Sequence, residues 1–409
     1  MNAISVGIDA SKGESMVMAM RPFGEVVFKP RKVLHTAGEL ESLAGFLKDL
    51  GGEVRAVTEA TGRYHEPVAE ALHRAGIFVS VVNPKLIKDY GNNTLRKVKT
   101  DKADAKKIAR YGLEYWDTLL EYTPTEAVRS RLKQISRQLT LYTQMKTQLK
   151  NNLIAILDQT FPGANKLFSS PARADGHEKW VDFVATFWHC ECVCGMSSKA
   201  FEARYQKWCE RRGYQFRLKN AEDVYLASHG LVTLLPKTSD TKMLVTEAAK
   251  QLTMISGTVE RFRAEMLRLA RSLPEWPVVA SFYGAGVTTG PQLMAEIGDV
   301  RRFSSRKFLI AFAGVDPGEN QSGQYKSKSE STSKRGSSHL RRTLFQVVET
   351  YVKRKPQDEP VYQFYAKKRA EGKKYYVCTT AAANKFLRIY HARVKEYLES
   401  VEQNPPCQG

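Results

Sequence analysis

Cysteine is scarce in this sequence, and it is unevenly placed. Six cysteines occur among 409 residues, and three of them, Cys190, Cys192 and Cys194, form a C-x-C-x-C run beside His189. So few cysteines in so long a chain do not form a disulfide framework, and we expect reduced thiols. The run could bind zinc, but its one-residue spacing differs from the usual C-x2-C arrangement and no matching second half follows. Structural thiols are the favoured interpretation, and metal binding at this run stays open.

Acidic residues are too few to balance the basic ones. Lys and Arg together number 63 against 43 Asp and Glu, which leaves a formal net charge of +20 at pH 7. A positive field of this strength suits a polyanion as partner. Nucleic acid is the first candidate, and an anionic membrane surface is the second.

Long apolar runs are absent, which weakens the membrane alternative. No stretch approaches the roughly 20 consecutive apolar residues that a membrane-spanning helix needs. The N-terminal segment MNAISVGIDASKGES also lacks the charged-then-apolar order of a secretion signal. We therefore predict a cytoplasmic protein with no membrane partner.

The first 110 or so residues alternate between strand and helix patterns. Three strands precede the first helix and alternation follows, which is the order of a ribonuclease-H-like sheet. The expected strands cover residues 3–9, 15–20, 24–29, 53–58 and 77–82, and the helices cover 37–50, 65–75 and a segment that begins near 100. The fold class is therefore α/β over 1–115, followed by an all-α remainder.

Acidic residues follow two of these strands and recur on the last helix. Asp9 ends the first strand, Glu59 follows the strand at 53–58, and Asp101 and Asp104 lie three residues apart at the start of the helix. That spacing places both aspartates on one face of the first helical turn. Such carboxylates can converge at one sheet edge and hold a pair of divalent cations. A D-x-x-D by itself is more simply an exposed helix start whose acids suit the helix dipole.

Two long amphipathic patterns define the middle of the chain. Apolar residues recur at threes and fours across 125–157 and again across 241–271, which is typical of long helices with coiled-coil character. They predict a region over 125–272 that forms an antiparallel hairpin or a dimerising arm. Its insert, at about 163–236, is rich in aromatic and basic residues that could stack bases. The core of a small helical subdomain is the favoured interpretation.

The last third, over 273–400, is expected to be mostly helical, with a tail at 401–409. Near its start, Gly284-Ala285-Gly286 leads into a helix, which resembles a helix-hairpin-helix. The free backbone N–H groups of such a hairpin can bind a backbone phosphate without reading sequence. It is not a dinucleotide-binding fingerprint, because no third glycine follows at the right place.

A polar and basic stretch follows Ser322, and its composition predicts a flexible loop against an anionic partner. Serine is common in such loops, so its position alone does not give Ser322 a chemical role. The candidate nucleic-acid-binding residues are the basic side chains of this stretch and of the helix after it, namely Lys326, Lys328, Lys334, Arg335, His339, Arg341 and Arg342. Some of them could neutralise a scissile phosphate, and ordinary backbone binding is the alternative.

Several motifs together resemble a known family. They are G-I-D-A-S-K around Asp9, T-E-A-T-G around Glu59, T-D-x-x-D at residues 100–104, and A-G-V-x-P followed by S-G and K-R-G-x-x-H-L-R. In this order they resemble the DEDD-type transposases of the insertion-sequence family numbered one-ten, recombinases guided by an element-encoded bridge RNA. The resemblance covers about 1–112 and 275–350. Ser337 departs from it, because an asparagine is frequent after K-R-G, and the aromatic insert makes this chain longer than compact members.

The resemblance implies that Asp9, Glu59, Asp101 and Asp104 bind Mg²⁺ in a RuvC-like domain, with two ions per site expected and Mn²⁺ as a possible substitute. It also implies that Ser322 is a nucleophile that forms a covalent phosphoserine link with DNA. Donor and target DNA, a structured bridge RNA and further copies of the chain, as a dimer or tetramer, are the implied partners. The implied location is a prokaryotic cytoplasm, with association with the nucleoid during activity.

Two other functions remain open at this point. A metal-dependent nuclease of the Holliday-junction type would use the acids with water as the nucleophile, and Ser322 would then be only a loop residue. A non-catalytic nucleic-acid-binding scaffold would use the basic surface alone.

Overall fold

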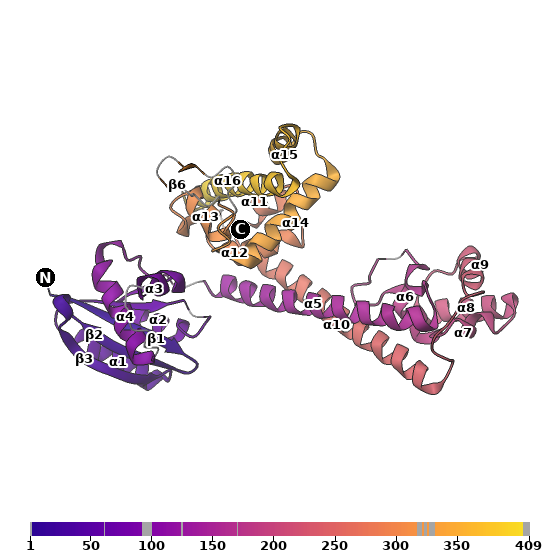
Figure 1. The fold of residues 1–409 in the computed structure, drawn as a ribbon, viewed down its shortest axis with the longest axis horizontal. Coiled ribbons are helices and arrows are strands. Elements are labelled where there is room, and N and C mark those ends of the chain that lie inside the picture. The colour runs from indigo at the N-terminus through magenta and orange to yellow at the C-terminus, as the bar shows by residue number, and fades with distance from the viewer. Residues whose placement is uncertain are drawn as a thin grey trace. The chain divides into compact units, whose positions relative to one another are not determined.

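The structure is a computed structural model that describes residues 2–60, 62–91, 100–123, 126–169, 171–316, 321–322, 325–326 and 332–403. The chain divides into two compact units, residues 1–125 and 126–409, whose elements are labelled in Figure 1. Within the described ranges, no helix is both long enough and apolar enough to cross a membrane.

The first unit is built on a five-stranded sheet with the strand order β3-β2-β1-β4-β5. Strands β1 and β2 pair antiparallel, as do β2 and β3, whereas β4 and β5 run parallel to β1. The strands are β1 (Ala3–Ser11), β2 (Glu14–Met20), β3 (Val26–Leu34), β4 (Glu53–Glu59) and β5 (Phe78–Val82). This order confirms the predicted ribonuclease-H-like sheet. Strand β3 runs further than expected because it pairs along β2 as far as Glu14 and Leu34.

Helices lie on both faces of this sheet. They are α1 (Ala37–Lys48), α2 (Glu66–Arg74), α3 (Pro84–Gly91) and α4 (Asp101–Glu114), with short 3-10 turns η1 (Pro22–Gly24) and η2 (Trp116–Thr118). Ile4, Val6 and Ile8 of β1 are buried in one cluster with residues of α1 and α2. The alternate residues of β1 point to the opposite face, and α4 packs there.

Glycine at position 7 allows α4 to approach β1 closely. A Cβ atom at Gly7 would lie 2.1 Å from the carbonyl oxygen of Ala105 and 2.4 Å from the backbone nitrogen of Ala109. Gly112, which follows Ala105 and Ala109 along α4, has the same role, because a Cβ there would lie 2.3 Å from the Oγ of Ser5 in β1. The helix backbone therefore rests directly on the strand, and residues that precede Ala105 lie beside residues that follow Gly7.

The second unit begins with two long helices packed against each other, α5 (Ala127–Thr160) and α10 (Ser239–Arg271). Leu132 and Leu139 cluster with Val259 and Met266, whereas Leu153 clusters with residues near the start of α10. The early half of α5 thus packs on the late half of α10, which is the antiparallel hairpin expected from the sequence. The finer domain boundaries at 115, 272 and 400 stay predictions.

The aromatic segment between these helices is a small helical body. It contains η3 (Ala164–Lys166), α6 (Lys179–Thr186), α7 (Glu191–Cys194), α8 (Ser198–Arg212) and α9 (Leu218–Ala227). Phe183, Phe187, Tyr205 and Trp208 are fully or almost fully buried and stack on one another. These aromatic side chains form a core, as the favoured interpretation of the insert predicts. Cys190 and Cys192 are buried in the same cluster, and burial raises the pKa of the Cys190 thiol.

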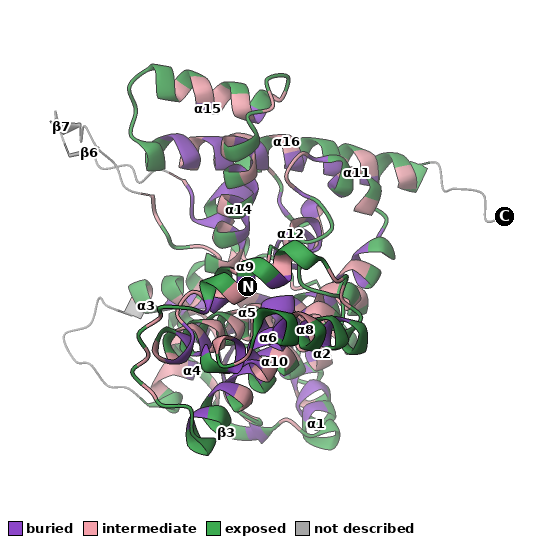
Figure 2. Ribbon diagram, turned by 90° about the vertical axis from the view of Figure 1, so that its right-hand side faces the viewer, coloured by how far each residue is buried: buried purple, intermediate pink, exposed green. Residues whose placement is uncertain are grey.

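The rest of the second unit is helical and has its own core. Its elements are α11 (Trp276–Ser281), α12 (Thr289–Ile297), η4 (Val300–Arg302), α13 (Arg306–Ala313), the two-residue strands β6 (Gln321–Ser322) and β7 (Tyr325–Lys326), α14 (Ser338–Arg354), α15 (Pro360–Ala370) and α16 (Tyr375–Gln403). Figure 2 shows buried residues along α14 and α16, which pack together in one cluster. The hairpin between α11 and α12 confirms the expected helix-hairpin-helix.

Replacement of Gly7 by alanine tests the close approach of α4. The added methyl group must push α4 off β1, and overpacking of this kind costs about 1–3 kcal/mol of folding free energy. We expect Gly7→Ala to lower the thermal unfolding midpoint measured by circular dichroism. The matched control is Gly45→Ala, since a Cβ at Gly45 within α1 meets nothing within 4 Å and the change should stabilise the helix by about 1 kcal/mol. Equal effects of the two variants would contradict the proposed role of Gly7.

Candidate active site

The strand ends and α4 bring the four sequence-predicted acids to one face of the sheet. Asp9 lies two residues after Gly7, so it projects from β1 on the side that α4 covers. Ile8 pairs with Thr58 in the parallel ladder, which places Asp9 next to Glu59 at the end of β4. Glu59 lies two residues after Val57, which packs against Ile108 and Tyr111 of α4. Both strand-end acids therefore face the helix.

The two remaining acids lie in the first turn of α4. Thr100 caps this helix, because its side chain accepts a hydrogen bond of 3.2 Å from the Ala103 N–H. Asp104 immediately precedes Ala105, the residue whose carbonyl rests on Gly7. Asp101 lies one turn earlier and is exposed, whereas Asp104 is partly buried and pairs with Lys107 at 3.1 Å.

Electrostatic repulsion among these acids is visible at Asp9. Its pKa is raised to about 6, first by burial and then by Asp104, Asp101 and Glu59, while Lys107 lowers it. Three separate carboxylates therefore act on one carboxyl group. This coupling joins residues from β1, β4 and α4 into one electrostatic site.

The donor set fits a hard divalent cation, which takes carboxylate oxygens as ligands. A divalent cation would also relieve the repulsion that raises the pKa of Asp9. In the described residues, however, no three His, Cys, Asp or Glu side chains are close enough to hold one ion together. Coulombic coupling acts over longer distances than the roughly 2.0–2.6 Å of a metal–oxygen bond. The acids therefore lie near one another, but their carboxylate oxygens are not arranged around one common ion position.

The predicted nucleophile lies in the other unit, on a short hairpin. Ser322 belongs to β6 and pairs with Tyr325 of β7, and Lys326 pairs with Gln321. The stretch that begins at Tyr325 was expected to be a flexible loop, but its first two residues, Tyr325 and Lys326, form strand β7, which pairs antiparallel with β6. Lys328 lies outside the described residues.

The remaining predicted basic residues lie where the chain returns toward α14. Lys334 and Arg335 are exposed, and the Lys334 N–H donates to the Gly314 carbonyl at 3.2 Å. Arg341 donates to the Ala313 carbonyl at 3.1 Å, so part of its guanidinium group holds the end of α13. Arg342 is exposed and lies one residue further along α14.

His339 was grouped with the basic side chains, but it does not act as a cation at neutral pH. Burial is the largest cause that lowers its pKa, and Arg137 and Arg342 lower it further, while Glu296 raises it. An imidazole whose pKa lies below its usual 6.5 is neutral at pH 7. It therefore offers hydrogen bonds rather than charge.

Sequence reasoning missed Glu296, a buried acid of α12 that contacts the start of α14. Its Oε2 accepts hydrogen bonds from Arg137 at 3.0 Å and from the Ser337 hydroxyl at 3.1 Å. Ser337 also caps α14 by accepting from the Leu340 N–H at 3.1 Å. Serine and asparagine are both strong N-cap residues, so the departure from the family pattern at this position keeps the cap. No local signal marks Glu296, because its partners come from distant segments.

Comparison with known proteins decides the family. A family model described as "Transposase" matches residues 6–162, and a second, described as "Transposase IS116/IS110/IS902 family", matches residues 277–363. The chain belongs to the IS110 family of transposases. This IS110-family chain is therefore a DNA transposase or recombinase, and the resemblance to the insertion-sequence family numbered one-ten is confirmed.

Three curated relatives cover most of this IS110-family chain. The "Insertion element IS116 uncharacterized 44.8 kDa protein" of Streptomyces clavuligerus is 23% identical over 90% of this chain and 89% of its own. The "Insertion element IS110 uncharacterized 43.6 kDa protein" of Streptomyces coelicolor is 21% identical over 73% of this chain and 71% of its own. The "Pilin gene-inverting protein" of Moraxella lacunata is 23% identical over 83% of this chain and 80% of its own. Among solved structures, Thermus thermophilus RuvC matches with a TM-score of 0.23 and 16% identity, covering 28% of this chain and 96% of that chain.

The raised pKa of Asp9 predicts an unusual dependence of stability on pH. A carboxyl group with a pKa of about 6 in the folded chain and 3.8 in the unfolded chain binds more protons when folded between these values. Stability from this group is thus present at low pH and is lost as pH rises through about 6. We expect Asp9→Asn to raise the thermal unfolding midpoint at pH 7.5 in EDTA, and this gain should shrink toward pH 4.

The control for this measurement is Glu41→Gln, because Glu41 is an exposed residue of α1 on the opposite side of the sheet. Its unfolding midpoint should follow that of the unaltered chain across the same pH range. Addition of Mg²⁺ at pH 7.5 should stabilise the unaltered chain more than Asp9→Asn. An Asp9→Asn midpoint that is lower at pH 7.5 would contradict the repulsion described here.

Proposed function

We propose that this chain is an RNA-guided DNA recombinase that cleaves and rejoins donor and target DNA through a covalent phosphoserine intermediate at Ser322. The observation that carries the proposal is the gathering of Asp9, Glu59, Asp101 and Asp104 on the α4 face of the sheet, where burial and then the three other carboxylates raise the pKa of Asp9 to about 6. The family membership supports strand cleavage and exchange as the reaction.

The proposed covalent step moves one phosphoryl group. The Ser322 Oγ forms a bond to the phosphorus of a DNA phosphodiester, the bond from phosphorus to one sugar oxygen breaks, and the serine proton ends on that leaving oxygen. The phosphoserine retains the energy of the phosphodiester, so a second sugar hydroxyl can reverse the step and join a new strand without ATP. A serine hydroxyl is a weak nucleophile at its own pKa and needs such assistance as a nearby base or metal supplies.

Asp9, Glu59, Asp101 and Asp104 are the residues that would hold Mg²⁺, with Mn²⁺ as a substitute. When bound there, a divalent cation supplies charge neutralisation and polarises phosphoryl oxygens. Lys107 already opposes the repulsion at Asp9, so the chain contributes part of the compensation itself. Two ions in the site and a dimeric or tetrameric assembly remain parts of the proposal.

Sequence choice by RNA is consistent with the distribution of charge. Base pairing reads the sequence in such systems, and the protein mainly needs to recognise shape and backbone charge. The excess of 63 basic over 43 acidic residues and the exposed Lys334, Arg335 and Arg342 supply backbone recognition. We place the exposed residues of 334–342 on the nucleic-acid surface.

Replacement of Ser322 distinguishes this proposal from a junction nuclease. Labelled DNA that carries the ends of the element is incubated with protein, its copurified RNA and Mg²⁺, and protein–DNA adducts are separated on a denaturing gel. We expect Ser322→Ala to lose both the adduct and cleavage by at least about a thousandfold, since loss of a nucleophile removes the reaction path. Asp9→Asn should lose both as well.

The matched control is Ser198→Ala, an exposed serine in the first turn of α8, whose loss should leave the adduct unchanged. Continued cleavage by Ser322→Ala without an adduct would overturn the serine mechanism. It would favour the nuclease in which water attacks and the acids act alone. Recombination by Asp9→Asn at the normal rate would instead favour a scaffold whose acids are not catalytic.

RNA guidance predicts that a specific RNA copurifies with the protein. We expect sequencing of nucleic acid that copurifies with the chain to find one abundant structured RNA encoded beside its own gene. Digestion of that RNA should abolish strand exchange, and its readdition should restore it. Strand exchange that survives complete RNA removal would contradict guidance by RNA while leaving the serine chemistry intact.

A further inference from the structure

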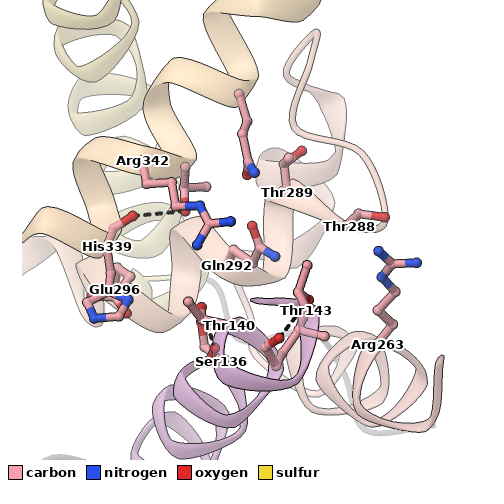
Figure 3. A pocket seen from close by; sticks show the side chains of 13 residues that line it. Ser136, Thr140, Thr143, Arg263, Thr288, Thr289, Gln292, Glu296, His339 and Arg342 are labelled. Carbon is pink, nitrogen blue, oxygen red and sulfur yellow. Dashed lines mark hydrogen bonds between the residues drawn. The ribbon is translucent and has the colours of Figure 1, made fainter. Parts of the chain in front are cut away.

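A polar cavity of about 180 Å³ lies inside the second unit, between α5, α10, α12 and α14. Figure 3 shows Arg342 entering it from α14, Arg263 lying near it on α10, and Thr288 and Thr289 on the hairpin side. These threonines close the helix-hairpin-helix at residues 284–290, where the Gly290 N–H bonds back to the Gly286 carbonyl at 2.8 Å. The cavity is therefore continuous with the hairpin whose type binds backbone phosphates.

The cavity carries positive charge on one part of its wall. Arg263 and Arg342 both line it, and they come from two different helices. The Nη1 of Arg263 pairs with Glu260 at 2.7 Å, whereas its buried Nε has no hydrogen-bond partner among the described residues. The one acid among its lining residues, Glu296, is already paired with Arg137 at 3.0 Å. Its wall therefore favours an anionic group, and guanidinium groups match the geometry of a phosphate.

Other parts of the wall present acceptors, beside the amide groups of Gln292 and Gln346, which can both donate and accept. Thr140 donates its hydroxyl proton to the Ser136 carbonyl at 3.0 Å, and Thr143 donates to the Leu139 carbonyl at 2.7 Å. A hydroxyl has only one proton, so these two oxygens can only accept a further hydrogen bond. In the described part of the chain, the buried Oε1 of Glu296 also has no hydrogen-bond partner. A hydrogen-bond donor on a ligand would satisfy one of these acceptor oxygens.

A ribonucleotide within a strand combines an anionic group with a hydrogen-bond donor on its sugar. Its phosphodiester is negative, and its 2′-hydroxyl can donate a hydrogen bond, whereas the corresponding unit of DNA has no sugar hydroxyl to donate. We propose that this cavity binds one ribose–phosphate unit of an RNA strand, with Arg342 and Arg263 at the phosphate and the Thr140 and Thr143 oxygens at the 2′-hydroxyl. The inference rests on the proposed function in that it gives the RNA partner a location on this chain.

The experiment measures binding rather than catalysis. Full-length protein freed of copurified nucleic acid is titrated in EDTA into a fluorescein-labelled single-stranded RNA of about 20 nucleotides and into DNA of the same sequence, and anisotropy is followed. The unaltered chain should prefer RNA. The double variant Thr140→Val with Thr143→Val should lose about tenfold in RNA affinity, roughly the loss expected for one hydrogen bond, with DNA affinity within twofold of the unaltered chain.

Arg342→Gln tests the phosphate part of the cavity separately. It should weaken binding of both strands and reduce the slope of log affinity against log salt by about 1, since one phosphate contact is lost. The control for the arginine is Arg354→Gln, at the exposed far end of the same helix. The control for the threonines is Thr246→Val with Thr258→Val, because both hydroxyls donate within α10 in the same way and neither lines the cavity.

The outcomes separate the cavity from the wider function. An equal loss of RNA and DNA affinity in the Thr140 and Thr143 variant, or no loss in either strand, would overturn the ribose contact. No effect of Arg342→Gln on either strand would overturn the site as a whole. A chain that binds RNA strongly while every cavity variant behaves normally refutes only this site, whereas a chain that binds no RNA refutes RNA guidance itself. Thermal midpoints within about 2 °C of the unaltered chain establish that the variants are folded.

Discussion

The direct contact between the backbones of α4 and β1 fixes the chemistry of the first unit. Gly7 has no side chain to separate them, so the carbonyl of Ala105 occupies space that a Cβ would need. Because Asp104 precedes that residue and Asp9 follows Gly7 by two positions, the same contact forces carboxylates into proximity. The packing of Ile108 and Ala109, both fully buried, stabilises an arrangement that electrostatics alone opposes. Fold stability and site assembly therefore depend on one small surface.

The sequence predicted this unit well because its information is local and periodic. The alternation in Ile4-Ser5-Val6-Gly7-Ile8-Asp9 predicts which side chains share a face, and a three-residue spacing predicts two aspartates on one helical turn. Neither pattern reveals how closely the helix approaches the strand. That distance follows from matching glycines in two separate elements, and only the assembled backbone shows that Gly7 and Gly112 lie against the same pair of elements.

The second unit was predicted less completely, since its decisive contacts join distant residues. Glu296 accepts hydrogen bonds from Arg137, 159 residues away in the sequence, and from Ser337, 41 residues away. No motif surrounds Glu296. The aromatic insert illustrates a different difficulty, because rings and cations have the same composition in a base-stacking surface and in a core. Burial separates the two: Tyr205 and Trp208 are at most 2% exposed, and the buried Lys179 lies over the Tyr205 ring with its pKa lowered by burial.

The basic surface of the chain and the acidic site around Asp9 act on a DNA phosphate in opposite directions. A DNA phosphate is attracted by a chain of net charge +20 but is repelled by the acids around Asp9, whose own repulsion already raises a carboxyl pKa. A bound cation would remove both repulsions. By linkage, any ligand that binds more tightly when the cation is present must also tighten the cation itself. Cation and DNA are therefore expected to bind cooperatively at these acids, so the acids would be loaded mainly when a phosphodiester is present to be cut.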